Sequence, residues 1–130
     1  MAKSSKRRNR SKYNNKKVEL DGRTFDSKAE VSYYLHLTEM EQAGSVTSFE
    51  CQVPFTLQDG YRSPETGRKV RPITYVADYV VRYPDGRQEV VDVKGSRGTM
   101  TDVFKMKKKM FEYRYKVPLK IVIISNGKIE

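Results

Sequence analysis

The sequence predicts one α/β domain with a central mixed sheet flanked by helices, preceded by a basic tail. Three observations support this fold class: a strand pair over Ile73–Gly95, a helix with a capping-box pattern at Ser27, and a second helix that Pro118 ends before an apolar strand. At 130 residues the chain is long enough for one core and too short for two.

The tail comprises residues 1–17, which hold eight Lys/Arg and no acid. Residues 18–130, the predicted domain, hold 18 basic and 16 acidic residues, a difference of +2, so the tail supplies most of the net charge of +10. Its composition predicts disorder until it meets a partner. A polyanion is the expected partner, with nucleic acid favoured over an anionic membrane surface because the tail has no apolar face. A tail that only increases solubility is the alternative. The tail residues assigned to nucleic-acid contacts are Arg7, Arg8, Arg10, Lys12, Lys16 and Lys17.

Several classes of protein do not fit the composition. No apolar run of about 18 residues is present, and the N-terminus has charge without an apolar segment, so neither a membrane span nor a secretory signal is expected. Cys51 is the single cysteine and His36 the single histidine, which disfavours a zinc site and a Cys/His catalytic pair. One cysteine suits a reducing cytoplasm, that of the host if the chain is phage-encoded.

The first elements are a short hairpin over Val18–Phe25, around an Asp-Gly turn, and a helix over Lys28–Ala43 that ends at Gly44. Glu30 has two interpretations. As a capping-box residue it would bond back to the amide of Ser27. It also begins a stripe that is expected to pack on the sheet and that continues with Tyr33, Leu37 and Met40.

An extended segment follows over Val46–Leu57, where Pro54 predicts an edge strand or a bulge. Residues 58–72 are rich in Gly, Pro, Arg and Ser and predict a mobile excursion. In the strand pair that comes next, pairing of Tyr83 with Arg87 across the turn would place Asp78 opposite Asp92, and Lys94 on the same face opposite Val76.

The second helix is expected over Asp102–Tyr115, with Thr101 as its N-cap. A buried strand over Leu119–Ser125 should follow. The pattern predicts a core-facing stripe of Val103, Met106, Met110, Tyr113 and Val117, and a lysine face of Lys105, Lys108, Lys109 and Lys116 on the opposite side. That face is either solvated or in contact with DNA, with Lys105 as a candidate contact.

Two aspartates that face each other on a strand pair cost stability, by tenths of a kcal/mol up to about 1 kcal/mol. A divalent cation explains them, because Mg²⁺ or Mn²⁺ prefers carboxylate oxygens and leaves coordination positions for water and phosphate. A solvated sheet face is the alternative.

The order helix, strand, strand, strand, helix, strand, with Glu30, Asp78 and the triplet Asp92-Val93-Lys94 at defined places, resembles the PD-(D/E)XK nuclease superfamily. The resemblance covers about Phe25 to Ser125. Its patterns F-x-S-x-x-E, F-E-x-Q, Y-x-x-D-Y and V-D-V-K-G are similar to those of small phage-encoded nucleases, transposon end-cutting nucleases and archaeal Holliday-junction resolvases. Ala77 stands where the family often has proline.

The resemblance implies a restriction-endonuclease-like core (αβββαβ) and a metal-dependent DNA endonuclease, with Mg²⁺ or Mn²⁺ as the only cofactor. It assigns Asp78, Asp92, the Val93 carbonyl and Glu30 as metal ligands and Lys94 as the residue beside the attacking water. Branched or recombination DNA is the implied substrate, and paired incisions would require a homodimer.

Gln52 and Arg97 are further candidate contacts to nucleic acid. A noncatalytic nucleic-acid-binding protein and a ribosome-type RNA-binding protein are the alternatives, and neither accounts for the facing aspartates.

Overall fold

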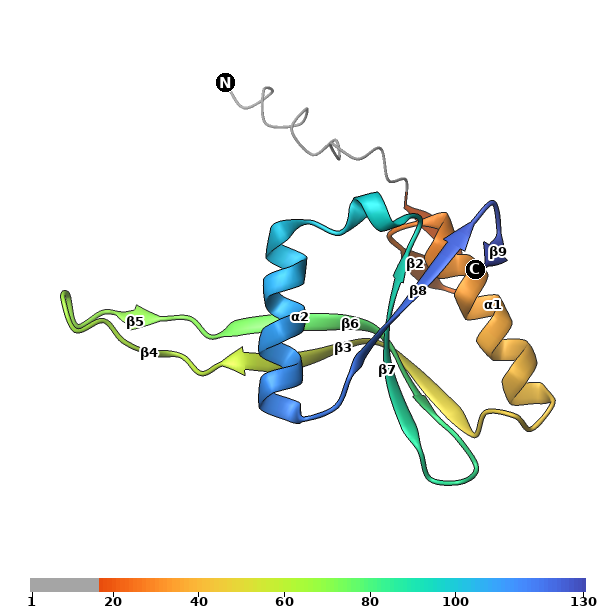
Figure 1. Cartoon of the computed structure of the whole chain (residues 1–130), viewed down its shortest axis with the longest axis horizontal. Coiled ribbons are helices and arrows are strands. Elements are labelled where there is room, and N and C mark those ends of the chain that lie inside the picture. Colours follow the sequence, from red (N-terminus) through yellow and green to blue (C-terminus); the bar gives the residue numbers. More distant parts are fainter. Residues whose placement is uncertain (1–16) are drawn as a thin grey trace, which may run out of the picture.

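The computed structural model describes residues 17–130 and has the predicted α/β class, with helices α1 (Lys28–Gln42) and α2 (Asp102–Tyr115) (Figure 1). The central five-stranded sheet has the order β3-β6-β7-β8-β9. Its strands are β3 (Ser48–Gln58), β6 (Ile73–Arg82), β7 (Gln88–Lys94), β8 (Leu119–Ser125) and β9 (Lys128–Ile129). Two small ladders complete the strands: β1 (Val18–Leu20) with β2 (Arg23–Phe25), and β4 (Tyr61–Arg62) with β5 (Lys69–Val70).

The sheet is mixed because α2 carries the chain from β7 to a parallel β8, while the other neighbours pair antiparallel. β3 lies at one edge, as Pro54 predicts. Neither helix within residues 17–130 is both long and apolar enough to cross a membrane.

The turn between β6 and β7 sets the register that the sequence predicts. The Tyr83 amide donates to the Arg87 carbonyl at 2.9 Å, and Gly86 has a φ of +89°, which favours glycine. The ladder runs from Arg82 opposite Gln88 to Tyr79 opposite Val91 and stops there.

Beyond that point β6 and β7 separate, so the predicted pairing of Lys94 with Val76 is wrong. β7 continues beside β8 as far as Lys94, whereas β6 continues beside β3, with Val76 opposite Pro54. Asp78 and Asp92, predicted to face each other, are the next residues after the last pair, so they are not part of the ladder and lie where the two strands diverge. The divergence opens one end of the sheet between two neighbouring strands.

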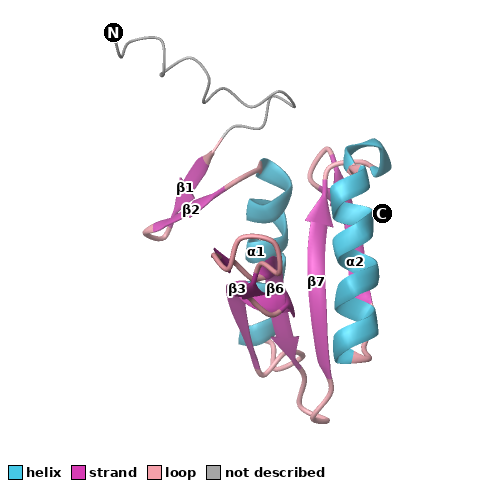
Figure 2. Cartoon of the chain, turned by 90° about the vertical axis from the view of Figure 1, so that its left-hand side faces the viewer, coloured by secondary structure: helices cyan, strands magenta, loops and turns pink. Residues whose placement is uncertain are grey.

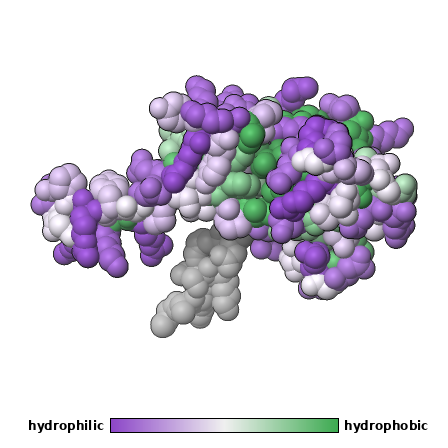
Figure 3. All heavy atoms as spheres, turned by 90° about the horizontal axis from the view of Figure 1, so that it is seen from below, coloured by the Kyte–Doolittle hydropathy of each residue, from purple (hydrophilic) through white to green (hydrophobic). Residues whose placement is uncertain are grey.

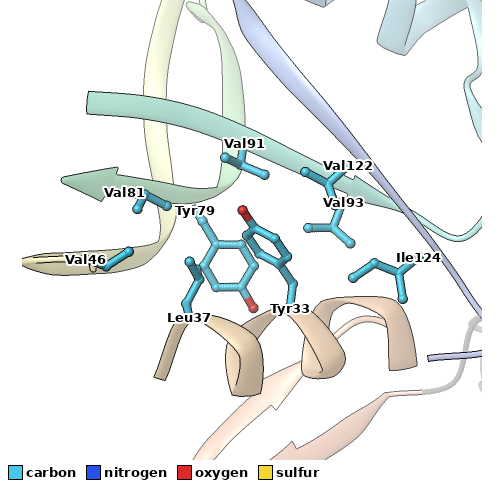
Figure 4. Close-up of a cluster of buried hydrophobic side chains, with 9 residues drawn as sticks. All are labelled: Tyr33, Leu37, Val46, Tyr79, Val81, Val91, Val93, Val122 and Ile124. Atoms are coloured by element: carbon cyan, nitrogen blue, oxygen red, sulfur yellow. The ribbon is translucent and has the colours of Figure 1, made fainter. Parts of the chain in front are cut away.

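The two helices cover opposite faces of the sheet (Figure 2). On the α1 face, Tyr33 and Leu37 pack against Tyr79, Val91 and other sheet residues (Figure 4). The α2 face buries an aromatic cluster that includes Phe104, Phe111 and Tyr75. Both cores are continuous across several strands.

The alternation of side chains between the two sheet faces is interrupted in both β3 and β6. Phe49, Cys51 and Tyr79 pack on the α1 side, but Val53 and Ala77, two residues along each strand, pack on the α2 side. The change occurs at Gln52, whose φ is +55°, a left-handed conformation that residues other than glycine seldom adopt. Gln52 lies across from Asp78, so the irregularity falls beside that aspartate.

Helix α1 buries the predicted face, with Glu30, Tyr33 and Leu37 buried. Helix α2 has the predicted bounds and the Thr101 cap, but the predicted core stripe is wrong. Its buried residues are Phe104 and Phe111. Four of the five predicted stripe residues, Val103, Met106, Tyr113 and Val117, are exposed by 44–80%. The aromatic face is buried instead because Phe rings bury more apolar area than Val or Met.

Two further segments differ from the sequence prediction. Residues 59–71, within the stretch 58–72 that the sequence predicts to be a mobile excursion, form the β4–β5 hairpin with a defined turn, which the sequence did not indicate. β9 was not predicted; it pairs with β8 across Asn126-Gly127, two residues with positive φ. An Asn-Gly turn is a sequence signal that could have identified it.

Candidate functional site

A cleft of about 920 Å³ lies at the end of the sheet where β6 and β7 separate. Glu30 from the start of α1, Asp78 from β6, and Asp92, Val93 and Lys94 from β7 all line it. The structure thus brings together every residue that the sequence assigns to catalysis or to metal binding.

Asp92 is the most buried of the aspartates that line the cleft, with 5% of its surface exposed. Its Oδ1 accepts a 2.7 Å hydrogen bond from the hydroxyl of Tyr75. Burial and then the charge of Asp92 raise the pKa of Tyr75 well above its usual range, so the phenol keeps the proton that it donates. Asp92 Oδ2 is buried and has no hydrogen-bond partner within residues 17–130.

Lys94 lies between this aspartate and an aromatic ring. Its Nζ is 3.1 Å from Asp92 Oδ2, close enough for an ion pair, but the geometry is not that of a hydrogen bond. The same ammonium lies 4.0 Å from the ring centroid of Phe104, within range of a cation–π interaction. The ion pair therefore leaves a lone pair of Asp92 Oδ2 available to another partner.

Asp78 reaches across the gap between the strands to the backbone of β7. Its Oδ2 accepts a 2.7 Å hydrogen bond from the Val93 amide. Burial raises the pKa of Asp78, and the charges of Asp92 and Glu30 raise it further; the Val93 hydrogen bond and Lys94 act in the opposite direction. Clustered acids in a poorly solvated site resist ionising together, which a bound cation would relieve.

Glu30 combines a helix-start position with a buried carboxyl group. Its amide donates to Ser27 Oγ at 3.2 Å, which is the capping half of the predicted motif. Its side chain is in the cleft, 6% exposed, and Oε1 accepts from Gln52 Nε2 at 3.3 Å. Burial, followed by the charges of Asp26 and Asp92, raises the pKa of Glu30 from 4.5 to about 7, against the lowering effects of a backbone hydrogen bond at Asp26 and of Lys94.

The donor set suits a hard divalent cation. Carboxylate and carbonyl oxygens are the ligands that Mg²⁺ and Mn²⁺ prefer, and Asp92 Oδ2, which has the Lys94 ion pair but no hydrogen-bond partner within residues 17–130, is a candidate ligand. Within residues 17–130 no group of three or more His, Cys, Asp or Glu side chains is already arranged to hold a metal ion. Asp78 is turned to the Val93 amide and Asp92 Oδ1 to Tyr75, so the carboxylates would have to exchange these hydrogen bonds for an ion.

The predicted nucleic-acid contacts are spread more widely. Arg7, Arg8, Arg10, Lys12 and Lys16 lie outside the described residues. Lys17 is exposed, with Nζ 3.9 Å from Asp26 Oδ1. Arg97, in a short 3-10 helix after β7, and Lys105, on α2, are also exposed, whereas Gln52 contacts Glu30.

Two residues of the site were missed by the sequence reasoning: Tyr75, which holds Asp92, and Phe104, which supports Lys94. A signal for Tyr75 was present, because it stands three residues before Asp78 in the Y-x-x-D-Y pattern. No local signal marks Phe104, since its contact depends on how α2 packs.

The chain belongs to a family of proteins of unknown function, DUF1064, whose family model matches residues 10–128. A search of curated proteins finds no match to the chain.

Proposed function

We propose that this protein is a divalent-metal-dependent DNA endonuclease that hydrolyses phosphodiester bonds in the cleft at the β6–β7 divergence. The proposal depends chiefly on one observation: Glu30, Asp78, Asp92 and Lys94 line a single cleft, where one buried carboxylate oxygen, Asp92 Oδ2, has no hydrogen-bond partner among the described residues. A solvated acidic surface would not bury Asp92 and Glu30 to 5% and 6% exposure.

The order of elements supports a restriction-endonuclease-like core. Helix α1, strands β3, β6 and β7, helix α2 and strand β8 follow the αβββαβ order, and β8 lies parallel to β7. The remaining strands are additions at the N-terminus, between β3 and β6, and after β8. Each acid occupies the corresponding element: Glu30 on the helix, Asp78 on the second strand and Asp92 on the third.

Asp78, Asp92 and the Val93 carbonyl would hold the ion, with Glu30 as a direct or water-bridged ligand. When bound, the ion would lower the pKa of a coordinated water and offset the charge that develops on the scissile phosphate. Tyr75 orients Asp92 through its 2.7 Å hydrogen bond.

Lys94 would orient the nucleophile and stabilise negative charge in the transition state. Its contacts to Asp92 and to the Phe104 ring fix the ammonium at the cleft. The expected products carry a 5'-phosphate and a 3'-hydroxyl, as the resemblance to the superfamily implies.

The direct test is cleavage with Mg²⁺ of four-way junctions, flaps, linear duplex and single strands. Asp92→Asn and Lys94→Ala should each lower the cleavage rate by about 100-fold or more, because each removes a group that acts on the reacting phosphate. Asp85→Asn, a change to an aspartate in the exposed β6–β7 turn, is the matched control and should cleave normally. Activity that survives in both site variants would remove the assignment.

Metal binding is tested separately by calorimetric titration with Mn²⁺. Wild type should bind Mn²⁺ and Asp78→Ala should not, because Asp78 supplies a predicted ligand. A protein that binds DNA but neither binds Mn²⁺ nor cleaves is the noncatalytic nucleic-acid-binding alternative.

Substrate and assembly follow from the same proposal. We favour branched recombination or replication DNA, cut by a homodimer acting in a reducing cytoplasm, that of the host if the chain is phage-encoded.

Deleting residues 1–17 should reduce the dependence of log K for DNA binding on log salt, because each phosphate contact of the tail releases counterions. Sedimentation with and without a four-way junction tests the dimer.

A further inference from the structure

Residues 59–71, the arm, form a two-stranded ribbon between β3 and β6 (Figure 1). β4 and β5 pair only with each other, and β3 and β6 are already joined at the base through Gln58 and Ile73. At about 3.3 Å per residue, about six residues on each side give the arm a reach of about 20 Å. In Figure 1 it extends away from both helices, and its exposed residues have no place in either core.

The arm is nevertheless a defined structure. At its tip, Ser63 Oγ accepts hydrogen bonds from the amides of Glu65 and Thr66 at 3.1 and 3.2 Å. The Ser63 amide donates to the Arg68 carbonyl at 2.8 Å. At its base the two backbones approach so closely that a Cβ on Gly60 would lie 2.9 Å from the Val70 carbonyl oxygen. These contacts shape the ribbon without burying it.

The basic residues of the arm are placed where their repulsion lowers the stability of the β4–β5 pair. Arg62 and Lys69 are directly opposite each other on β4 and β5, an arrangement of like charges that normally destabilises a strand pair. With Arg68 and Arg71 they make four basic residues, all exposed, and none of the four forms an ion pair within residues 17–130. Of the two acids on the arm, Asp59 is paired with Arg114 of α2. Arg62 Nη1 donates to the Gly67 carbonyl at 3.2 Å, but this neutral partner leaves the charge of the two facing cations for an external anion to neutralise.

We propose that the arm binds the major groove of duplex DNA beside the cleavage site, a role that rests on the proposed DNA substrate. The major groove is about 12 Å wide and admits a two-stranded ribbon, and guanidinium groups bind both phosphates and guanine edges. The arm is mostly hydrophilic (Figure 3), unlike the apolar centre of a protein–protein interface.

β6 joins the arm to the cleft, because this strand begins two residues after Arg71 and carries Asp78. Asp78 is seven residues after Arg71, a span of about 23 Å along an extended strand. A duplex in the cleft that continues toward the arm would meet it within about one helical turn, since one turn rises about 34 Å. The arm therefore selects duplex on one side of the scissile phosphate.

The test compares Arg62→Gln/Lys69→Gln with Arg87→Gln/Lys120→Gln, which removes the same charge from exposed positions where β7 and β8 begin, at the opposite end of β7 from Lys94. Binding of a 30-base-pair duplex is measured by fluorescence anisotropy in EDTA, so that no cleavage is needed. The arm variant should bind about tenfold more weakly, with a salt slope smaller by about 1.8, the value expected when two phosphates are no longer neutralised. The control should keep more than half of the wild-type affinity.

Thermal unfolding shows whether the arm variant is folded. Its midpoint should equal or exceed that of wild type, because the change removes a like-charge pair. If the midpoint falls, the paired variant Arg68→Gln/Arg71→Gln, which leaves the cross-strand pair intact, repeats the binding measurement.

Dimethyl sulfate protection distinguishes the grooves in one reaction, because the reagent methylates guanine N7 in the major groove and adenine N3 in the minor groove. Wild type should protect guanine N7 on one flank of the duplex, and the arm variant should lose that protection. Protection of adenine N3 alone, or unchanged affinity and salt slope in the arm variants, would overturn the proposal.

Two other results distinguish DNA binding by the arm from a dimer contact and from the nuclease proposal. An arm variant that changes from dimer to monomer in sedimentation, with unaltered DNA affinity, would assign the arm to a second copy of the chain and overturn the DNA role. If wild type fails to cleave any substrate but shows arm-dependent duplex binding in EDTA, the nuclease proposal fails and the arm proposal stands.

Discussion

The two helices lie on opposite faces of one sheet and bring different chemistry to the same cleft. Both begin with a hydroxyl cap, Ser27 for α1 and Thr101 for α2. From its first turn α1 delivers a buried carboxyl group, Glu30, whereas α2 delivers the Phe104 ring on which the Lys94 ammonium rests.

Because of this difference, variants of α1 and variants of α2 should change different properties of the cleft. Changes at the start of α1 alter the charge available for a metal ion and the pH dependence of stability. Changes on the inner face of α2 alter the aromatic packing and, through it, the position of one cation. Variants of each helix test this division, beginning with the largest expected effect.

Phe111→Ala should have the largest effect, since this ring is fully buried and contacts Phe55, Tyr75 and Tyr115. Removal of a buried Phe side chain costs about 3–5 kcal/mol of unfolding free energy. Tyr113→Ala, on the same helix but 80% exposed, should change it by no more than about 0.5 kcal/mol. Urea unfolding followed by circular dichroism measures both. A larger loss for Tyr113→Ala than for Phe111→Ala would mean that α2 packs with the other face inward, and equal losses would contradict the burial of Phe111 alone.

The pH dependence of stability should identify α1 as the side that carries the buried acid. Burial raises the folded-state pKa of Glu30 to about 7, so the protonated carboxyl is favoured in the fold. Its stabilising effect is complete below the unfolded pKa, near 4.5, and is lost as the pH rises through 7. The loss of unfolding free energy is at most about 3–4 kcal/mol, from 1.36 kcal/mol per pKa unit.

Unfolding free energies in EDTA at pH 4.5, 6 and 8 provide the measurement. The stability of wild type relative to Glu30→Gln should fall across this range, and Mg²⁺ should restore part of it at pH 8. A difference that stays constant with pH would contradict a buried, protonated Glu30.

Glu30→Gln should lower Mg²⁺-dependent cleavage by about 10–100-fold, the usual cost of losing a group that supports a metal site. Glu41→Gln is the matched control, because Glu41 is exposed near the other end of the same helix. Raising the Mg²⁺ concentration should recover part of the activity of Glu30→Gln. If both variants cleave at the wild-type rate, Glu30 acts only within the helix start.

Phe104→Leu should have the smallest effect, because a cation–π contact contributes about 0.5–2 kcal/mol, or about 2- to 30-fold in rate. The turnover rate should fall while the Michaelis constant stays within about twofold, since the ring positions Lys94 and does not bind substrate. Phe104→Tyr, which keeps an aromatic face, should restore the rate. Equal rates for Leu and Tyr would show that the ring only fills space.

Local signals in the sequence were sufficient for much of the architecture. Ser27 and Gly44 bracket α1, Thr101 and Pro118 bracket α2, and Pro84-Asp85-Gly86 sets the register of β6 with β7. Each depends on interactions between residues close in the chain, so the pattern contains the necessary information.

Other features had no such local determinant. The inward face of α2 is chosen by competition between two apolar stripes on one helix, and the Phe104–Phe111 stripe is buried because it meets Phe55 and Tyr75 from distant strands. The sequence does not indicate the hairpin of the arm, because the turn residues of 58–72 are typical of a mobile excursion and two-residue strands are too short to give an alternating pattern.

For the candidate site, the sequence alone determined that Asp78, Asp92 and Lys94 lie on two strands joined by one tight turn, because Pro84-Asp85-Gly86 is a local turn signal. Only the tertiary structure decided that β6 and β7 separate just past Tyr79 and Val91, that Tyr75 holds Asp92, and that α1 closes over the gap with Glu30. Burial and charge proximity follow from that packing. They raise the pKa values of Glu30 and Asp78 and leave Asp92 Oδ2 without a hydrogen-bond partner in residues 17–130, which no spacing of residues along the chain could specify.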